Sequence, residues 1–299
     1  MLSRIFLFKY LHKAIRYVKI DAVKIFKTGR GMQSLKREIV EKWYKKLGFS
    51  NAYDLDFLAI LKNTDLSDLS DFSSYDYKHN TPQKNLLACL YFCENLEKEY
   101  EKRGIDKQIL IDSLQDLVLW NDSYFAIHNQ MGLTEFPWLD RTFLLQIFRL
   151  GRLQFCMFES DFTIEKIGVK KGEMVLEVHI PRGGALSKIE CEKSFAMAKD
   201  FFKKYYPDFP IEYCICHSWL LDDSLLPILG ENSNVANFQK FFEIIQKDKS
   251  DAVLKFTFLW NTTRETVKNA TPTSRFSTKL KERALAGDIF YEALGVKKL

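Results

Sequence analysis

The stretch LEVHIPRGGALS, residues 176–187, decides the fold more than any other part of this chain. It begins as a strand-like run that ends at a proline, continues with an arginine and two adjacent glycines, and leads into a helical pattern after Ser187. Strand, glycine loop and helix in this order are typical of a phosphate site, because free N–H groups and the positive end of the helix dipole face the anion. The stretch therefore predicts an anion-binding loop.

The loop supplies the groups that such a site needs. Gly183 and Gly184 have no Cβ atoms, so a ligand can approach the backbone, and Arg182 can add a positive charge beside a phosphate. Two glycines before a helix are also a common turn, and the loop taken alone favours that plainer interpretation. The order of the surrounding elements has to decide between the two.

Outward from the loop, the pattern changes near residue 147. Beyond it we expect strands at 152–159, 174–180, 211–219, 252–260 and near 289, and helices at 187–206, 233–246 and 277–286. Before it the pattern is helical, with N-cap candidates at Ser34, Thr81, Asp106 and Asn121 and a loop at 65–76. We therefore predict an extension at 1–31, a helical domain at 32–146 and an α/β domain at 147–299.

Four stretches mark this order of elements: RLGRLQF (149–155), VHIPRGGALS (178–187), CHSWLLDDSL (216–225) and SNVANFQKFFEI (233–244). In their order and sequence these stretches resemble the GNAT acyltransferase fold. From about residue 31 the chain is similar to a bacterial family that joins a helical N-terminal acyltransferase domain to a GNAT-like C-terminal domain. The resemblance implies an α+β fold with a central, mostly antiparallel sheet.

The resemblance also implies transfer of an acyl group from acetyl-CoA or another acyl-CoA, without a metal, to an amine of a small molecule or peptide. Its loop and helix start would hold the pyrophosphate of acyl-CoA. The residues so implied are Arg182, Gly183, Gly184, Ala185, Leu186, Ser187, Asn234 and Asn237. The loop is more compressed than the usual R/Q-x-x-G-x-G/A pattern. Phe241 and Phe242 stand where a tyrosine often protonates the departing thiolate, so a non-catalytic module that binds CoA or another anion is the alternative.

The residues themselves indicate where the chemistry would take place. Glu177 and His179 share one face of strand 174–180, and burying both is costly unless they are paired or hydrated. Amine acylation needs a base, so we predict His179 or Glu177 in that role, directly or through water. His217 ends the neighbouring strand at the same edge, and His217 or Ser218 would orient the substrate or protonate the thiolate. The alternative for either histidine is a hydrogen bond to the backbone inside the core.

Composition and charge exclude other classes of protein. Residues 1–48 hold 13 Lys and Arg against 3 Asp and Glu, and the remaining 251 hold 31 against 36, which argues against a nucleic-acid surface spread over the fold. Residues 5–27 form a basic amphipathic pattern that can lie weakly on an anionic membrane or dock on a partner, although packing on its own protein is the simpler alternative. No apolar run approaches the roughly 18 residues of a membrane-spanning helix, and we expect no signal peptide.

The six cysteines have no zinc-site spacing. We therefore expect buried free thiols and a cytoplasmic protein. Arg149 and Arg152 flank Gly151 at the junction of the two predicted domains, and there we expect an interdomain salt bridge rather than a phosphate contact. The oligomeric state does not follow from the sequence.

Overall fold

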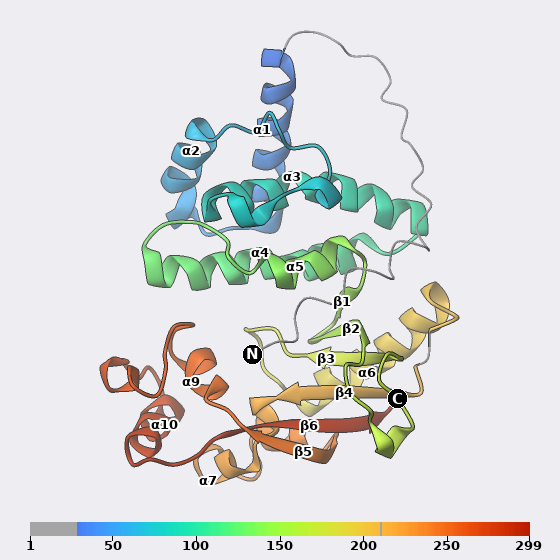
Figure 1. Ribbon diagram of the computed structural model, residues 1–299, viewed down its shortest axis with the longest axis vertical. Coiled ribbons are helices and arrows are strands. Elements are labelled where there is room, and N and C mark those ends of the chain that lie inside the picture. Colours follow the sequence, from blue (N-terminus) through green and yellow to red (C-terminus); the bar gives the residue numbers. More distant parts are fainter. Residues whose placement is uncertain (1–28, 210) are drawn as a thin grey trace.

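The computed structural model describes residues 29–209 and 211–299. A helical half is followed by a half that contains a single sheet of six strands (Figure 1). The predicted α+β class with a mixed, mostly antiparallel sheet is confirmed. The predicted amphipathic segment at 5–27 lies outside the described residues, and the division into 1–31, 32–146 and 147–299 stays a prediction.

Between residues 29 and 145 the helical half contains five α-helices. Their bounds are α1 (Gly29–Leu47), α2 (Asp54–Asn63), α3 (Pro82–Arg103), α4 (Lys107–His128) and α5 (Phe136–Phe143). The start of α3 is as predicted: the Thr81 side chain accepts a hydrogen bond from the backbone N–H of Lys84, and proline occupies the first turn. The end of α3 is also as predicted, because Gly104 adopts a left-handed φ of 66°.

Two predicted helix starts are wrong. Ser34 lies inside α1 rather than at its start. Asn121 lies inside α4, which is one uninterrupted helix capped by Asp106. Asn121 is buried, and its side-chain oxygen accepts a hydrogen bond from the backbone N–H of Gly132. From the sequence alone, a polar residue that makes a tertiary contact from inside a helix cannot be distinguished from an N-cap residue.

The second half is built on a sheet whose strands follow the order β1-β2-β3-β4-β6-β5. The strands are β1 (Ile147–Leu150), β2 (Leu153–Glu159), β3 (Met174–His179), β4 (Tyr213–Ser218), β5 (Glu243–Lys249) and β6 (Tyr291–Lys298). The helices are α6 (Lys188–Tyr205), α7 (Leu226–Leu229), α8 (Asn234–Gln239), α9 (Ala252–Thr257) and α10 (Arg275–Leu285). All neighbouring strands are antiparallel except β3 and β4.

Three elements of this half differ from the prediction. The predicted helix at 233–246 ends at Gln239, and its second part is the edge strand β5, whose hydrogen bonds come from pairing with β6. The predicted strand at 252–260 is helix α9, because Val253 and Leu254 pack together against residues of α10. Short apolar runs do not separate strand from helix by periodicity alone. Strand β1 was not predicted, and it joins β2 through a turn at Gly151.

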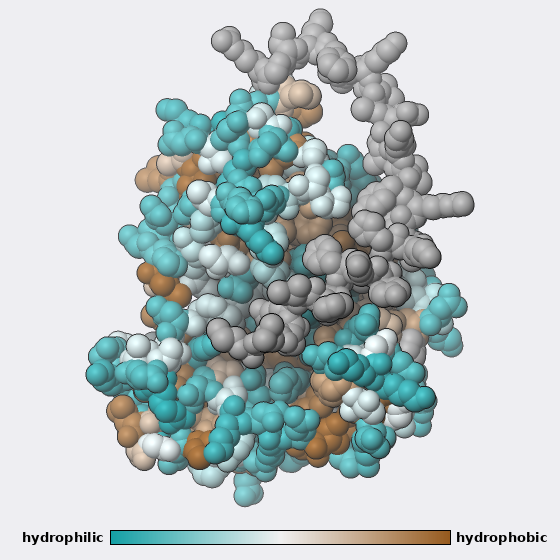
Figure 2. Space-filling model, in the orientation of Figure 1, coloured by the Kyte–Doolittle hydropathy of each residue, from teal (hydrophilic) through white to brown (hydrophobic). Residues whose placement is uncertain are grey.

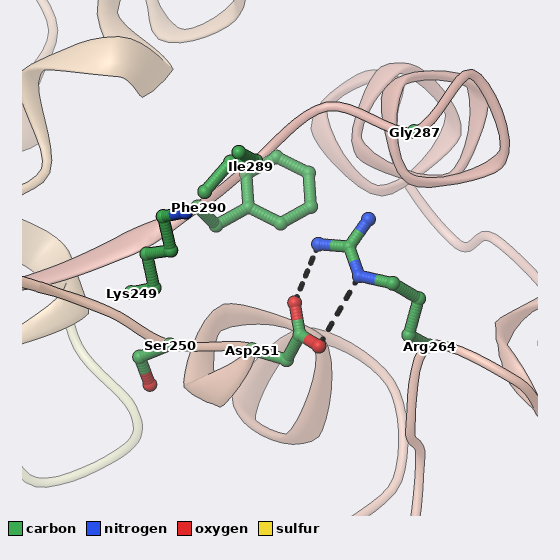
Figure 3. Close-up of a pocket in the computed structure, with 7 residues that line it drawn as sticks. All are labelled: Lys249, Ser250, Asp251, Arg264, Gly287, Ile289 and Phe290. Carbon is green, nitrogen blue, oxygen red and sulfur yellow. Dashed lines mark hydrogen bonds and ion pairs between the residues drawn. The ribbon is translucent and has the colours of Figure 1, made fainter.

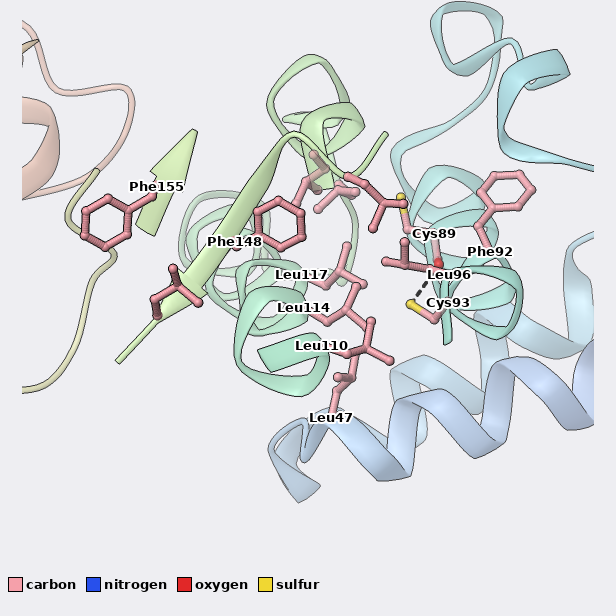
Figure 4. Packing of buried hydrophobic residues seen from close by; sticks show 14 of the residues in the cluster. Leu47, Cys89, Phe92, Cys93, Leu96, Leu110, Leu114, Leu117, Phe148 and Phe155 are labelled. Carbon is pink, nitrogen blue, oxygen red and sulfur yellow. Dashed lines mark hydrogen bonds between the residues drawn. The ribbon is translucent and has the colours of Figure 1, made fainter. Parts of the chain in front are cut away.

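The two halves share one hydrophobic core. Phe148 of β1 and Phe155 of β2 belong to the same cluster of buried residues as Leu110, Leu114 and Leu117 of α4 (Figure 4). Helices α4 and α5 lie between the other helices and the sheet (Figure 1). The face seen in Figure 2 is mostly hydrophilic, with small separate hydrophobic areas. The helical half is therefore packed onto the sheet as a fixed part of the molecule.

Candidate active site

The parallel pair β3 and β4 separates at its carboxyl end. The two strands are in register at only two positions, Leu176 with Cys214 and Glu177 with Ile215. Beyond these positions β3 continues to His179 and β4 to Ser218 without further pairing between them. The facing edges therefore offer backbone N–H and C=O groups that another extended chain can use. The glycine loop follows β3 just beyond this unpaired stretch.

The glycine loop, residues 181–187, presents bare backbone to solvent. Gly183 and Gly184 have φ values of 88° and 71°, a left-handed conformation that residues with side chains rarely adopt. Among the described residues, no backbone N–H from position 182 to 186 donates a hydrogen bond. The loop ends at Ser187, whose hydroxyl caps α6 by accepting from the Glu190 N–H. Exposed N–H groups before a helix start are suited to bind an anion.

The side chain of Arg152 holds this loop by hydrogen bonds to its backbone. Its Nη1 donates to the Pro181 carbonyl at 2.9 Å, and its Nε donates to the Ala185 carbonyl at 3.2 Å. In a trans peptide the C=O and N–H bonds point in opposite directions, so the N–H groups that follow these two carbonyls point away from Arg152. The backbone of Arg152 is held in turn by Ser194 of α6, whose hydroxyl accepts from the Arg152 N–H at 2.8 Å.

The predicted interdomain salt bridge of Arg149 and Arg152 is wrong. Neither guanidinium pairs with a carboxylate within 29–209 and 211–299. Partial burial lowers the pKa of Arg152, whose donors are used on loop carbonyls instead. Arg149 donates from Nε only to the carbonyl of Gly151. These hydrogen bonds explain the motif RLGR (149–152). The hairpin turn at Gly151 places Arg152 where its side chain reaches the carbonyls of the glycine loop.

Glu177 and His179 form a close pair on β3. A Glu177 carboxylate oxygen lies 3.0 Å from His179 Nε2, at ion-pair distance but off the line of a hydrogen bond. Only 14% of the Glu177 side chain and 21% of the His179 side chain are exposed. Burial opposes the charge on His179, but Glu177 and Cys156 outweigh it and raise the pKa of His179 to about 9. Burial likewise opposes the charge on Glu177, but His179 and Arg141 hold the pKa of Glu177 below its usual range.

The helical half contacts this pair through α5. The ring of Trp138 lies edge-on to His179, with centroids 4.7 Å apart, and Arg141 Nη1 lies 3.9 Å from a Glu177 oxygen. The Trp138 N–H donates to Asp116 of α4 at 2.9 Å, and burial raises the pKa of Asp116. The prediction did not include these three residues. The spacing of Trp138 and Arg141 puts them on one face of a helix, but nothing in the sequence connects that face to β3.

The other predicted catalytic residues lie at the same edge. His217 is exposed and lies two residues beyond Ile215, the register partner of Glu177, so it occupies the same face as His179. The Ser218 hydroxyl accepts from the Leu220 N–H at 3.1 Å and keeps its own proton for another partner. The structure thus brings Glu177, His179 and His217 together on one face. Their catalytic roles stay predictions.

The two predicted asparagines lie on α8, which packs against α6. Asn234 is exposed at the first residue of α8. The Asn237 side-chain oxygen accepts from Lys240 at 3.2 Å. No described hydrogen bond joins either residue to the glycine loop. Their role in binding a cofactor stays a prediction, as does that of the loop.

One cavity lies apart from this site. It has a volume of about 400 Å³ and is lined by Lys249, Ser250, Asp251, Arg264, Gly287, Ile289 and Phe290 (Figure 3). Arg264 donates from two nitrogens to the Asp251 carboxylate, which occupies both groups. This cavity contains none of the predicted site residues.

All six cysteines are free and buried, as predicted. Burial raises the pKa of Cys214 to about 12, so this thiol is protonated at neutral pH. Among the described residues no three His, Cys, Asp or Glu side chains gather closely enough to hold a metal ion. Within the same residues, every helix is too short or too polar to cross a membrane.

Comparison with protein families and solved structures adds independent findings. Residues 147–297 match the GNAT-like C-terminal domain, and residues 35–145 match the N-acyltransferase N-terminal domain. A solved acyltransferase in complex with decanoyl-CoA is 19% identical, with a TM-score of 0.71 over 87% of this chain and 87% of that chain. An acyltransferase in complex with decanoyl-CoA and teicoplanin is 18% identical, with a TM-score of 0.65 over 93% of this chain and 90% of that chain.

A third solved structure is an acyltransferase in complex with CoA and 10C-teicoplanin. It is 18% identical to this chain, with a TM-score of 0.65 over 92% of this chain and 88% of that chain. At these identities the structures establish a common fold. No protein of curated function matches the chain in sequence.

Proposed function

Because the chain belongs to the family defined by the GNAT-like C-terminal domain, we infer that it is an acyltransferase that moves an acyl group from acyl-CoA to an amine. The observation that carries this inference is the position of the glycine loop. Its unpaired N–H groups lie directly after β3, whose last residues hold the Glu177–His179 pair. Only Ile180 thus separates the proposed anion site from the proposed proton-transfer site along the chain.

We propose that the loop binds the pyrophosphate of acyl-CoA. The N–H groups that point away from Arg152 would donate to phosphate oxygens, and Arg182 is exposed and makes no ion pair with a described residue. The split between β3 and β4 would receive the extended arm of the substrate, because amide groups of that arm can pair with the free strand edges. The thioester would then lie near His179 and His217.

The reaction needs one bond to form and one to break. The amine nitrogen attacks the thioester carbonyl carbon, a C–N bond forms, and the C–S bond breaks as the thiolate leaves. Neutral His179 would take the proton from the amine. His217 or Ser218 would return a proton to the thiolate. Because the pKa of His179 is about 9, the neutral form becomes abundant only in alkaline solution, so turnover should rise with pH up to about that value.

We propose that the acceptor is an amine of a small molecule or a peptide. The solved neighbours that contain teicoplanin support a bulky acceptor, and the contact of α5 with the Glu177–His179 pair supports an acceptor site beside the helical half. Six free buried thiols support a cytoplasmic location.

Release of free CoA, measured with a thiol reagent, tests the proposal. Acetyl-, octanoyl- and decanoyl-CoA would each be combined with a panel of amines, and mass spectrometry would identify acylated products. We expect release that depends on both acyl-CoA and an amine. Calorimetric binding of CoA without release under any of these conditions would favour the non-catalytic module instead, for which the phenylalanines at 241 and 242 are the motivation.

A further inference from the structure

We propose that Arg141 of α5 is a positioning residue for the acyl transfer: from the helical half of the molecule, it shares the Glu177 carboxylate with His179. This inference rests on the proposed function, because it assigns a role in that reaction. The helical half would then take part in proton transfer through Arg141, in addition to lining the acceptor site.

The first step of the inference is that α5 touches both members of the pair. Trp138 and Arg141 are three residues apart on α5, which places them on the same face of the helix. Trp138 lies edge-on to His179, and Arg141 faces Glu177 at 3.9 Å. One helical face therefore contacts the histidine with an aromatic ring and the glutamate with a positive charge.

The second step is that Arg141 is itself held in position. Its guanidinium lies over the Trp138 ring, 5.3 Å from the ring centre, and its Nη1 lies 3.6 Å from the Cys156 sulfur. Trp138 is fixed by its hydrogen bond to Asp116, which is 4% exposed. A guanidinium that is stacked and fixed in this way loses little further conformational freedom when it faces a carboxylate.

The third step concerns the charges around His179. The titratable or charged groups that face this imidazole or its partner come from five elements: Asp116 of α4, Arg141 of α5, Cys156 of β2, Glu177 of β3 and His217 of β4. Arg141 is the one permanently positive group in this set. Its removal leaves the Glu177 carboxylate to interact with His179 alone, which favours the charged imidazole and raises the pKa of His179.

The experiment is an NMR titration of the histidine side chains combined with pH profiles of kcat/KM. The chain has five histidines, so His179 can be assigned by single substitution. In Arg141→Gln we expect the pKa of His179 to rise by about half a unit or more, and the rising limb of the pH profile to move with it. Turnover at neutral pH should fall about threefold or more, while KM for acyl-CoA stays nearly constant.

Two matched variants serve as controls. Arg141→Lys keeps the positive charge and should restore most of the titration and of the turnover. Arg264→Gln removes the arginine–carboxylate pair that lines the cavity apart from the site (Figure 3) and should leave the His179 titration unchanged. Arg141→Met keeps the packing on Trp138 and replaces Arg141→Gln if that variant does not fold.

An unchanged His179 titration in folded Arg141→Gln or Arg141→Met would overturn the inference. So would a KM effect of the same size as the loss of turnover, since that would assign Arg141 to substrate binding. If the wild-type protein released no CoA with any amine, the proposed function would fail. A shifted titration would even then support the contact between Arg141 and the pair.

Discussion

The glycine loop and the Glu177–His179 pair are neighbours in the sequence, but they are assembled in different ways. The loop is built from its own backbone, braced by one arginine and followed directly by the helix that it caps. The pair is built from side chains whose environment comes from α4, α5, β2 and β4. The proposed binding element is thus local in the sequence, whereas the proposed proton-transfer element of the same site depends on both halves of the molecule.

This difference separates what substitutions should do. Changes in the loop should alter affinity for CoA, because they affect the N–H groups and little else. Changes at the pair should alter turnover and its pH dependence, because they affect the protonation of His179.

The largest effect is expected at His179. His179→Ala removes the proposed base and should lower turnover by about a hundredfold or more, which is the usual contribution of a positioned base. Affinity for CoA should change little, because the loop is intact. Steady-state kinetics with a thiol reagent would measure the loss. A variant with nearly full turnover would remove β3 from the chemistry.

The next effect is expected at Arg152, beneath the loop. Arg152→Gln loses the two hydrogen bonds to the loop carbonyls, and each such bond from a charged group is worth about 1.5–3 kcal/mol at most. We expect about a tenfold weaker affinity for CoA, which is about 1.4 kcal/mol, with a smaller change in turnover at saturating acyl-CoA. Calorimetry would measure it. An equal loss in turnover and none in affinity would contradict the separation.

A smaller and more specific effect is expected at Glu177. Glu177→Gln removes the carboxylate that raises the pKa of His179, so burial then dominates and the pKa should fall from about 9 toward or below its usual value. The rising limb of the pH profile should move to lower pH. His179→Ala in the same assay provides the reference without the imidazole. A limb that stays near pH 9 would assign it to another group.

The same pair should contribute to stability with a definite sign. The folded-state pKa of His179 lies above its unfolded value, so the contribution is fully present below the unfolded pKa and is lost as the pH rises through about 9. The difference in the free energy of unfolding between wild type and Glu177→Gln should therefore shrink from pH 6 to pH 10. Urea unfolding at both pH values would show it, and a difference that grows would contradict the assignment of charges.

The smallest effect on activity is expected at an ion-pair cluster in the helical half. Glu97 of α3 contacts Lys46 at 2.6 Å and Lys107 at 2.9 Å, and its pKa is about 2 because these lysines outweigh burial. Glu97→Gln should lower the free energy of unfolding by about 1–2 kcal/mol at neutral pH and leave kcat/KM unchanged. That stabilisation is present above the unfolded pKa and is lost as the pH falls toward 2. A large change in kcat/KM would show that helix packing, not local contacts, controls the site.

The sequence was sufficient to predict the parts of the site that are local. The proline, the two glycines and the Ser187 cap determine the loop within seven residues, and alternation on β3 puts Glu177 and His179 on one face. The positions of Arg141, Trp138 and Asp116 near the pair could not be predicted, because their contacts depend on how the two halves pack together. The same limit applies to α9 and β5, where packing on α10 and pairing with β6 decided between helix and strand.

The central claim is that the glycine loop binds CoA and that the Glu177–His179 pair carries out proton transfer. Calorimetric titration of CoA into three proteins tests this claim most directly. Wild type and His179→Ala should bind CoA with similar affinity. Gly184→Val should bind at least tenfold more weakly while remaining folded by circular dichroism, because a valine at a φ of 71° displaces the backbone that carries the N–H groups. Unchanged affinity in a folded Gly184→Val protein, or loss of affinity in His179→Ala, would contradict the account.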